Sequence, residues 1–197
     1  AAQRENDLRA RLALGNAIAA YAPESVGELD LAAHIIQSSG RAMGNSDARQ
    51  AEEAKRLRER ALTLLPTSHQ HLLGLHGFFE ERELPDQAFE KIKACAEAHP
   101  QSPLALAELA SDLVRKHFMV EAEQNLEKAV ALDDIFLARL VQFHETHGNK
   151  VRARELRQKQ IALGQLDPDA QLELAFNEGN LAKAEELLSA LEKSYPD

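Results

Sequence analysis

The chain has 197 residues, of which 44% are hydrophobic and 28% are charged, so it can bury a core and disorder is not expected. Its formal net charge is −9, and this acidic balance argues against nucleic acid and anionic membrane surfaces as partners. No apolar run approaches the roughly 20 residues that span a bilayer, so we expect no direct membrane insertion.

The chain starts at Ala1 rather than at Met and contains a single cysteine, Cys95. A lone cysteine cannot form an internal disulfide, so it does not distinguish an oxidising from a reducing compartment. The missing Met suggests a matured protein or an excised domain that has lost a signal, an anchor or further repeats. We expect a soluble domain, and its localisation, periplasmic or cytoplasmic, stays open.

The N-terminal third predicts helices with an irregular pattern. Residues 2–20 predict one amphipathic helix, which we interpret as a cap or as the remnant of a preceding repeat. The helix predicted at 28–43 matches the later repeats poorly. We therefore expect capping helices and a degenerate first repeat over residues 1–66, followed by a region of regular repeats over residues 67–197.

Small residues recur along the chain with a step of 34 that later shortens to 31. Two series share the first step: Ala54, Ala88 and Ala122, and Ala61, Cys95 and Ala129. A small side chain at such a position lets two helices cross closely. The period predicts helical hairpins at about 69–102, 103–133, 134–164 and 165–197.

Each repeat is predicted to contain two antiparallel helices. In the clearest repeat, residues 103–116 and 120–132 carry apolar residues at helical spacing. Gly148 and Gly179 lie between paired helices, where we expect a left-handed residue to end the first helix. Prolines such as Pro100 are expected to stop the second helix of a repeat.

This pattern resembles the tetratricopeptide repeat (TPR) family, of the bacterial scaffold type. The residues that match the family pattern are Leu72, Leu75, His76, Phe79, Ala88, Ile92, Cys95 and Pro100 in one repeat, and Leu106, Leu109, Ala110, Leu113, Ala122, Leu126, Ala129 and Asp134 in the next. The third and fourth repeats match less well, since His144 replaces an aromatic residue and Pro168 leaves a first helix short. The resemblance implies an all-α fold, a right-handed α-solenoid of antiparallel helix pairs.

Eight histidines raise the alternative of a metal site. The best candidates are His69, His71 and His76 in one segment, and His144 with His147 in another. Zinc needs three or four converging ligands, and no CxxC or HExxH spacing occurs. We therefore predict no metal and no cofactor, and we interpret His76 and His144 as core histidines that hydrogen-bond to a neighbouring hairpin.

Other candidate chemistry also has a simpler interpretation. Cys95 falls where the repeat requires a small buried residue, which favours packing over nucleophilic catalysis. Neighbouring carboxylates such as Glu80 and Glu81 point in different directions on a helix. The basic stretches 55–60 and 150–159 contain interleaved glutamates and are expected to be solvated faces. Because no phosphate loop, GxSxG or SxxK motif is present, we predict that the chain is not an enzyme.

The resemblance implies that the first helices of the repeats line a concave groove that binds a partner protein. By register, the expected groove residues are Leu73, Gly77, Glu80, Glu81, Ala107, Ser111, Val114, Arg115, Ala138, Gln142, Glu145, Asp169, Glu173, Phe176 and Asn177. Their apolar floor and mostly acidic rim predict a peptide or helix segment with apolar anchors and basic residues as the partner.

The chaperone-binding subclass of the family grips a terminal carboxylate with Lys and Asn side chains on the first helices. The corresponding positions here hold Leu73, Gly77, Ala107 and Ser111, so that clamp is absent. The resemblance then implies a non-catalytic scaffold for protein–protein interaction, within a larger assembly or secretion system such as an exopolysaccharide or envelope complex. Two alternatives stay open: a homo-oligomeric structural module, and an accessory or regulatory domain of a larger membrane protein or enzyme.

Overall fold

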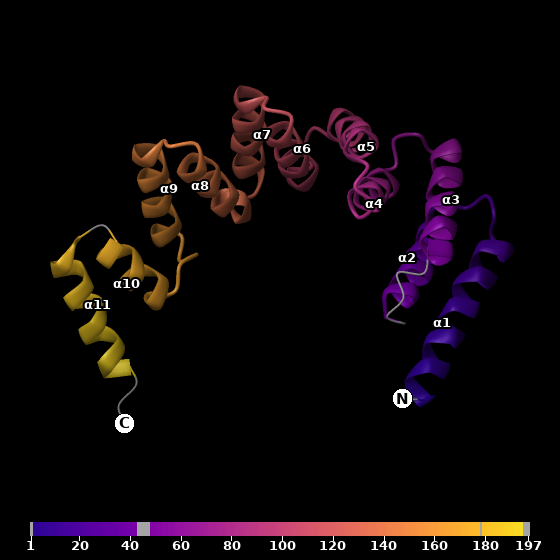
Figure 1. Ribbon diagram of the computed structural model, residues 1–197, viewed down its shortest axis with the longest axis horizontal. Coiled ribbons are helices and arrows are strands. Elements are labelled where there is room, and N and C mark those ends of the chain that lie inside the picture. The colour runs from indigo at the N-terminus through magenta and orange to yellow at the C-terminus, as the bar shows by residue number, and fades with distance from the viewer. Residues whose placement is uncertain (1, 43–47, 178, 195–197) are drawn as a thin grey trace. The chain divides into compact units, whose positions relative to one another are not determined.

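The computed structural model describes residues 2–42, 48–177 and 179–194, and all regular structure in these ranges is helical (Figure 1). The chain divides into two compact units, unit 1 (Ala1–Leu132) and unit 2 (Asp133–Asp197). The helices of unit 1 are α1 (Ala2–Tyr21), α2 (Val26–Ala42), α3 (Ala48–Leu64), α4 (His69–Glu80), α5 (Pro85–Ala98), α6 (Pro103–Arg115) and α7 (Met119–Leu132). Unit 2 contains a short 3-10 helix (Asp134–Phe136), α8 (Leu137–Thr146), α9 (Lys150–Ala162), α10 (Pro168–Asn177) and α11 (Leu181–Ser194).

Sequential helices pack against each other as hairpins. In unit 1, α2 packs on α1 and α3, α4 packs on α3 and α5, and α6 packs on α5 and α7. In unit 2, α8 packs on α9, and α10 packs on α11. The predicted all-α fold of antiparallel helix pairs is therefore confirmed, while the division predicted after Pro66 stays a prediction from the repeat pattern.

The small residues of the predicted series lie in the core of the hairpins. Their side chains are all fully buried: Ala54, Ala61, Ala88, Cys95, Ala122 and Ala129. In the N-terminal region, Leu29, Ile36 and Leu57 form a buried cluster with Ala54 and Ala61, and α1 covers this cluster with partly buried Leu12 and Ile18. The first helix thus contributes apolar surface to the core of its neighbours.

Helix ends follow local chemistry. Pro85 and Pro103 occupy the first turn of α5 and α6, where a missing backbone N–H costs no helical hydrogen bond. The Ser102 side chain accepts a hydrogen bond from the backbone N–H of Ala105 at 3.2 Å, and Asn149 caps α9 through the N–H of Arg152. These contacts fix where each helix begins.

A residue with a left-handed backbone follows each of the first helices α4, α6, α8 and α10. Gly148 (φ 80°) and Gly179 (φ 69°) confirm the expectation for their turns. In the two preceding hairpins, Glu83 (φ 56°) and His117 (φ 64°) hold the same place in the repeat. The sequence did not reveal these two turns, because no glycine marks them. The short connection imposes the conformation even on a residue with a Cβ.

This strain predicts opposite effects for two substitutions. A left-handed residue with a Cβ costs about 1–2 kcal/mol, so His117→Gly is expected to raise the free energy of unfolding by about 0.5–1 kcal/mol after the added entropy of the unfolded chain is subtracted. Gly148→Ala is expected to lower it by about 1 kcal/mol. Urea denaturation of the three proteins measures both changes, and a destabilised His117→Gly variant would contradict the account.

Candidate functional site

A buried polar cluster joins the first helices of two successive hairpins in unit 1. His76 and Glu80 come from α4, and Asp112 and Arg115 come from α6; we call these four residues the α4–α6 polar cluster. Arg115 Nη1 and Nη2 donate to the two carboxylate oxygens of Glu80 at 2.7 and 2.8 Å, and Nη2 also donates to Asp112 Oδ1. Because the Arg115 guanidinium bonds to both carboxylates, it fixes α4 and α6 relative to each other.

The deeper half of the cluster is less completely bonded. The side chain of Asp112 is only 2% exposed and that of His76 only 9% exposed. His76 Nε2 lies 3.5 Å from Asp112 Oδ2, and neither atom has a hydrogen-bond partner among the described residues. His76 is therefore a buried histidine that faces the neighbouring hairpin, as expected. The two atoms face each other across the hairpins without forming the predicted hydrogen bond.

A second polar link connects α2 with α4. His71 is fully buried, with Nδ1 2.6 Å from Ser68 Oγ and Nε2 3.9 Å from a carboxylate oxygen of Asp30. Burial lowers the pKa of His71 below its ordinary value of 6.5; Asp30 opposes this shift, and Arg58 adds to it. His69 forms a separate contact, from Nε2 to Ser102 Oγ at 2.7 Å. The three histidines considered as one metal candidate therefore have different partners.

The residues expected to line a groove can be located in each unit separately. In unit 1, Leu73 and Gly77 on α4, Glu81 directly after it, and Ser111 and Val114 on α6 are exposed or half-buried; we call them the first-helix face of unit 1. Ala107 is fully buried, so its side chain offers no surface to a partner. In unit 2 the expected residues are exposed on α8 and α10: Ala138, Gln142, Glu145, Asp169, Glu173, Phe176 and Asn177.

The expected acidic rim is partly neutralised by arginines. Glu80 is bonded to Arg115, and Glu145 accepts from Arg157 Nε at 2.7 Å. Register alone could not show these pairs, because Arg115 lies one repeat beyond Glu80 and Arg157 lies on the following helix. A basic partner would therefore have to compete with an internal arginine at both glutamates.

Two glycines in α4 have contrasting surroundings. A Cβ built on Gly74 would lie 2.2 Å from Nε of the buried Arg58, so the absence of a side chain there makes room for that arginine. A Cβ on Gly77 would meet nothing within 4 Å. Glycine in a helix interior costs about 1 kcal/mol relative to alanine, and packing does not explain it at Gly77. The open position lies within the first-helix face.

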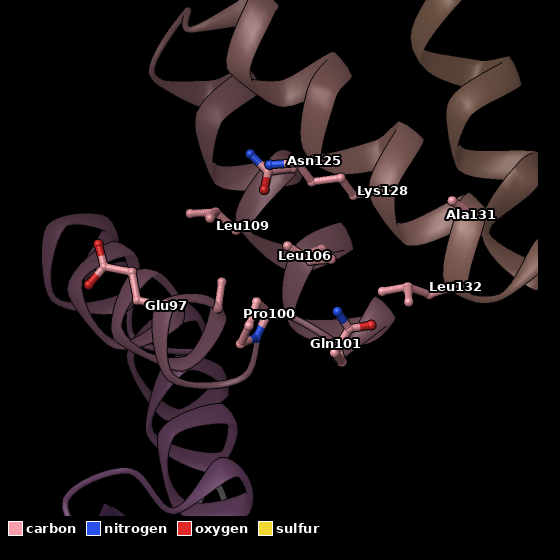
Figure 2. Close-up of a pocket in the computed structure, with 10 residues that line it drawn as sticks. Glu97, Pro100, Gln101, Leu106, Leu109, Asn125, Lys128, Ala131 and Leu132 are labelled. Carbon is pink, nitrogen blue, oxygen red and sulfur yellow. The ribbon is translucent and has the colours of Figure 1, made fainter.

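A pocket of about 490 Å³ lies in unit 1, between α5, α6 and α7 (Figure 2). Leu106, Leu109 and Leu132 contribute apolar surface, and Glu97 and Lys128 add opposite charges. Sequence reasoning missed this pocket, because its lining comes from three helices of two repeats and the repeat pattern does not show how their side chains pack. Its mixed lining could receive an apolar side chain.

The thiol of Cys95 does not form a reactive site. Cys95 is fully buried, and its Sγ lies 3.9 Å from the backbone oxygen of His69. Burial raises the pKa of the thiol to about 11, so the reactive thiolate is scarce at neutral pH. These properties agree with the packing role expected from the repeat position.

Among the described helices, none is both long enough and apolar enough to cross a membrane.

Comparison with known proteins places this fold among TPR proteins. No protein-family model matches the sequence, and no curated protein matches it. Among solved structures, PilF of Pseudomonas aeruginosa is 15% identical with a TM-score of 0.65, covering 98% of this chain and 94% of its own. YrrB, described as a TPR protein with an unusual peptide-binding site, is 16% identical with a TM-score of 0.61, covering 93% of both chains. A MamA structure is 20% identical with a TM-score of 0.58, covering 85% of this chain and 90% of its own.

These likenesses confirm the TPR-like fold class that the sequence predicted. At identities of 15 to 20% they concern the fold alone.

The contrast between the two glycines predicts substitutions of opposite sign on one helix. Gly77→Ala is expected to raise the free energy of unfolding by about 0.5–1 kcal/mol, since alanine favours the helix and its Cβ enters open space. Gly74→Ala is expected to lower it by about 1 kcal/mol, because buried Arg58 must move. Chemical denaturation compares the two variants, and equal stabilisation by both would refute the packing role of Gly74.

The lowered pKa values of His69 and His71 predict a loss of stability in acid. Burial is the main cause for both residues, and His99 adds to the shift of His69. The unfolded chain binds more protons below the ordinary value of 6.5, so the free energy of unfolding should fall as pH drops below 6.5. Urea melts between about pH 5 and 7.5 measure the slope. His71→Gln should flatten it, and an unchanged slope would exclude His71 as a source.

Proposed function

We propose that this protein is a non-catalytic scaffold that binds a segment of another protein on the first helices of its hairpins. The observation that carries the proposal is Gly77, a glycine within α4 whose Cβ would meet nothing within 4 Å and which is half-buried, as Leu73 on the same helix is. A helix position that gives up about 1 kcal/mol without a packing reason suits the close approach of a ligand.

The chemistry of the face indicates the kind of partner. Leu73 and Val114 are half-buried apolar side chains, and the hydroxyl of exposed Ser111 donates to the backbone oxygen of Ala107 and can accept a hydrogen bond from a partner. The α4–α6 polar cluster links α4 to α6, so a partner would meet a preformed surface. We therefore propose an extended or helical segment with aliphatic or aromatic anchors and a few basic residues.

The structural neighbours support a peptide as the partner only by analogy. YrrB is described as having an unusual peptide-binding site, and its fold is similar to this one. A place in an assembly or secretion system, such as an exopolysaccharide or envelope complex, remains a proposal that rests on the family resemblance. A second copy of the chain and an attached domain of a larger protein are the competing partners.

Filling the space above Gly77 tests the location of binding. Gly77→Phe should abolish capture of a partner from lysate and envelope fractions of the source cell, because the ring occupies the open position. Ala94→Phe, at an exposed position of the second helix α5, is the matched control and should retain the partner. Circular dichroism melts verify that both variants fold, and concentration-dependent mass reports self-association.

A partner held equally by both variants would move the interface away from the first-helix face. The pocket between α5, α6 and α7 would then be the next location to test. Self-association that Gly77→Phe removes would identify the partner as a second copy.

A further inference from the structure

Two buried polar atoms of the α4–α6 polar cluster point to a use beyond helix packing. His76 Nε2 and Asp112 Oδ2 face each other at 3.5 Å inside unit 1, and within the described part of the chain neither atom has a hydrogen-bond partner. Burying such atoms unbonded is costly, because each has lost its hydrogen bonds to water and gained none in return. A cation between them would satisfy both.

The geometry of these atoms suits a transition metal. A tetrahedral ion with bonds of about 2.0–2.1 Å separates two of its ligand atoms by roughly 3.3 Å. Glu80 lies one helical turn after His76 on α4 and supplies a third ligand. One ligand atom from each of His76, Glu80 and Asp112 lies within 4.8 Å of the other two.

Arg115 supplies the positive charge that faces the two carboxylates of the α4–α6 polar cluster. Its guanidinium is bonded to both Glu80 oxygens and to Asp112 Oδ1. A carboxylate as buried as Asp112 needs a positive partner, and either a guanidinium or a divalent ion can serve. The Arg115 side chain is 50% exposed, so it can turn toward solvent when a metal takes over its contacts with the two carboxylates.

We propose that His76, Glu80 and Asp112 form a binding site for a divalent transition metal, with Zn²⁺ as the best fit, and that Arg115 competes with the metal for the two carboxylates. One imidazole nitrogen and two carboxylates are a ligand set that zinc accepts, whereas Ca²⁺ and Mg²⁺ prefer oxygen ligands alone. The metal would join α4 to α6 beneath the first-helix face. This proposal is independent of which partner binds there.

Sequence reasoning predicted no metal because it looked for ligands close together along the chain. Asp112 lies a full repeat beyond His76, and only the packing of α4 against the next hairpin brings the two together. The His76–Glu80 spacing of one helical turn was the available signal, and the fourth coordination position is left for water or a partner group.

Titration with Zn²⁺ and Co²⁺ tests the site on the full chain. Isothermal calorimetry should show one ion bound per chain, and bound Co²⁺ should show the visible absorption of a tetrahedral centre. His76→Gln should weaken binding at least about tenfold, whereas His147→Gln, on an exposed histidine of unit 2, should leave it unchanged.

Arg115→Gln separates a metal site from a purely structural cluster. Removing the competitor should strengthen Zn²⁺ binding by about tenfold or more, and Zn²⁺ should restore the thermal stability that the substitution removes. The double variant His76→Gln with Arg115→Gln should lose both effects. Failure of the wild type and of Arg115→Gln to bind Zn²⁺, or binding that His76→Gln leaves intact, would overturn the proposal.

Discussion

The close crossing of neighbouring helices is the constraint on which the rest of the structure depends. It is possible because alanine or cysteine occupies the crossing points, from Ala54 and Ala61 to Ala122 and Ala129, all fully buried. A larger side chain at any of these points would push the helices apart and misalign the side chains beyond them. The imidazole of His76 on α4 and the carboxylate of Asp112 on α6 are short side chains. They can meet only if the helices lie close together.

Polar and charged side chains then join the helices that the close crossing brings together. Arg115 holds Glu80 and Asp112 together, and His71 lies between Ser68 and Asp30, so successive first helices are joined by specific polar contacts. Buried polar groups contribute less to stability than apolar packing does, but they restrict how two helices can be aligned. On the proposed function, a first-helix face that presents Leu73, Gly77 and Val114 to a partner would benefit from that restriction. Rigidity of the first-helix face and a partner's affinity are therefore linked.

Much of the fold could be predicted from the sequence, because the repeat sets both the period and the residue types. The spacing between Ala88 and Ala122 predicted where the hairpins lie. The prolines after α3 and α5 predicted where the second helices end. The left-handed Glu83 and His117 could not be predicted, since neither residue type marks such a turn.

The site was less predictable, because it depends on contacts between repeats. Register placed Leu73, Gly77 and Val114 on accessible surface, yet it also placed Ala107 there, which is fully buried. It treated Glu80 as part of an acidic rim and missed its pairing with Arg115. Which residues of one repeat meet those of the next is a property of packing, and a one-dimensional pattern does not contain it.

Site-specific photo-crosslinking tests the central claim, that a partner binds the first helices, most directly. A photoreactive residue would replace Ser111 on the first-helix face in one protein and Lys128 at the pocket on α7 in another, since both positions are exposed. The account predicts that a partner from the source cell crosslinks at position 111 and not at 128. Crosslinking at 128 alone would contradict it and would assign binding to the pocket between α5, α6 and α7.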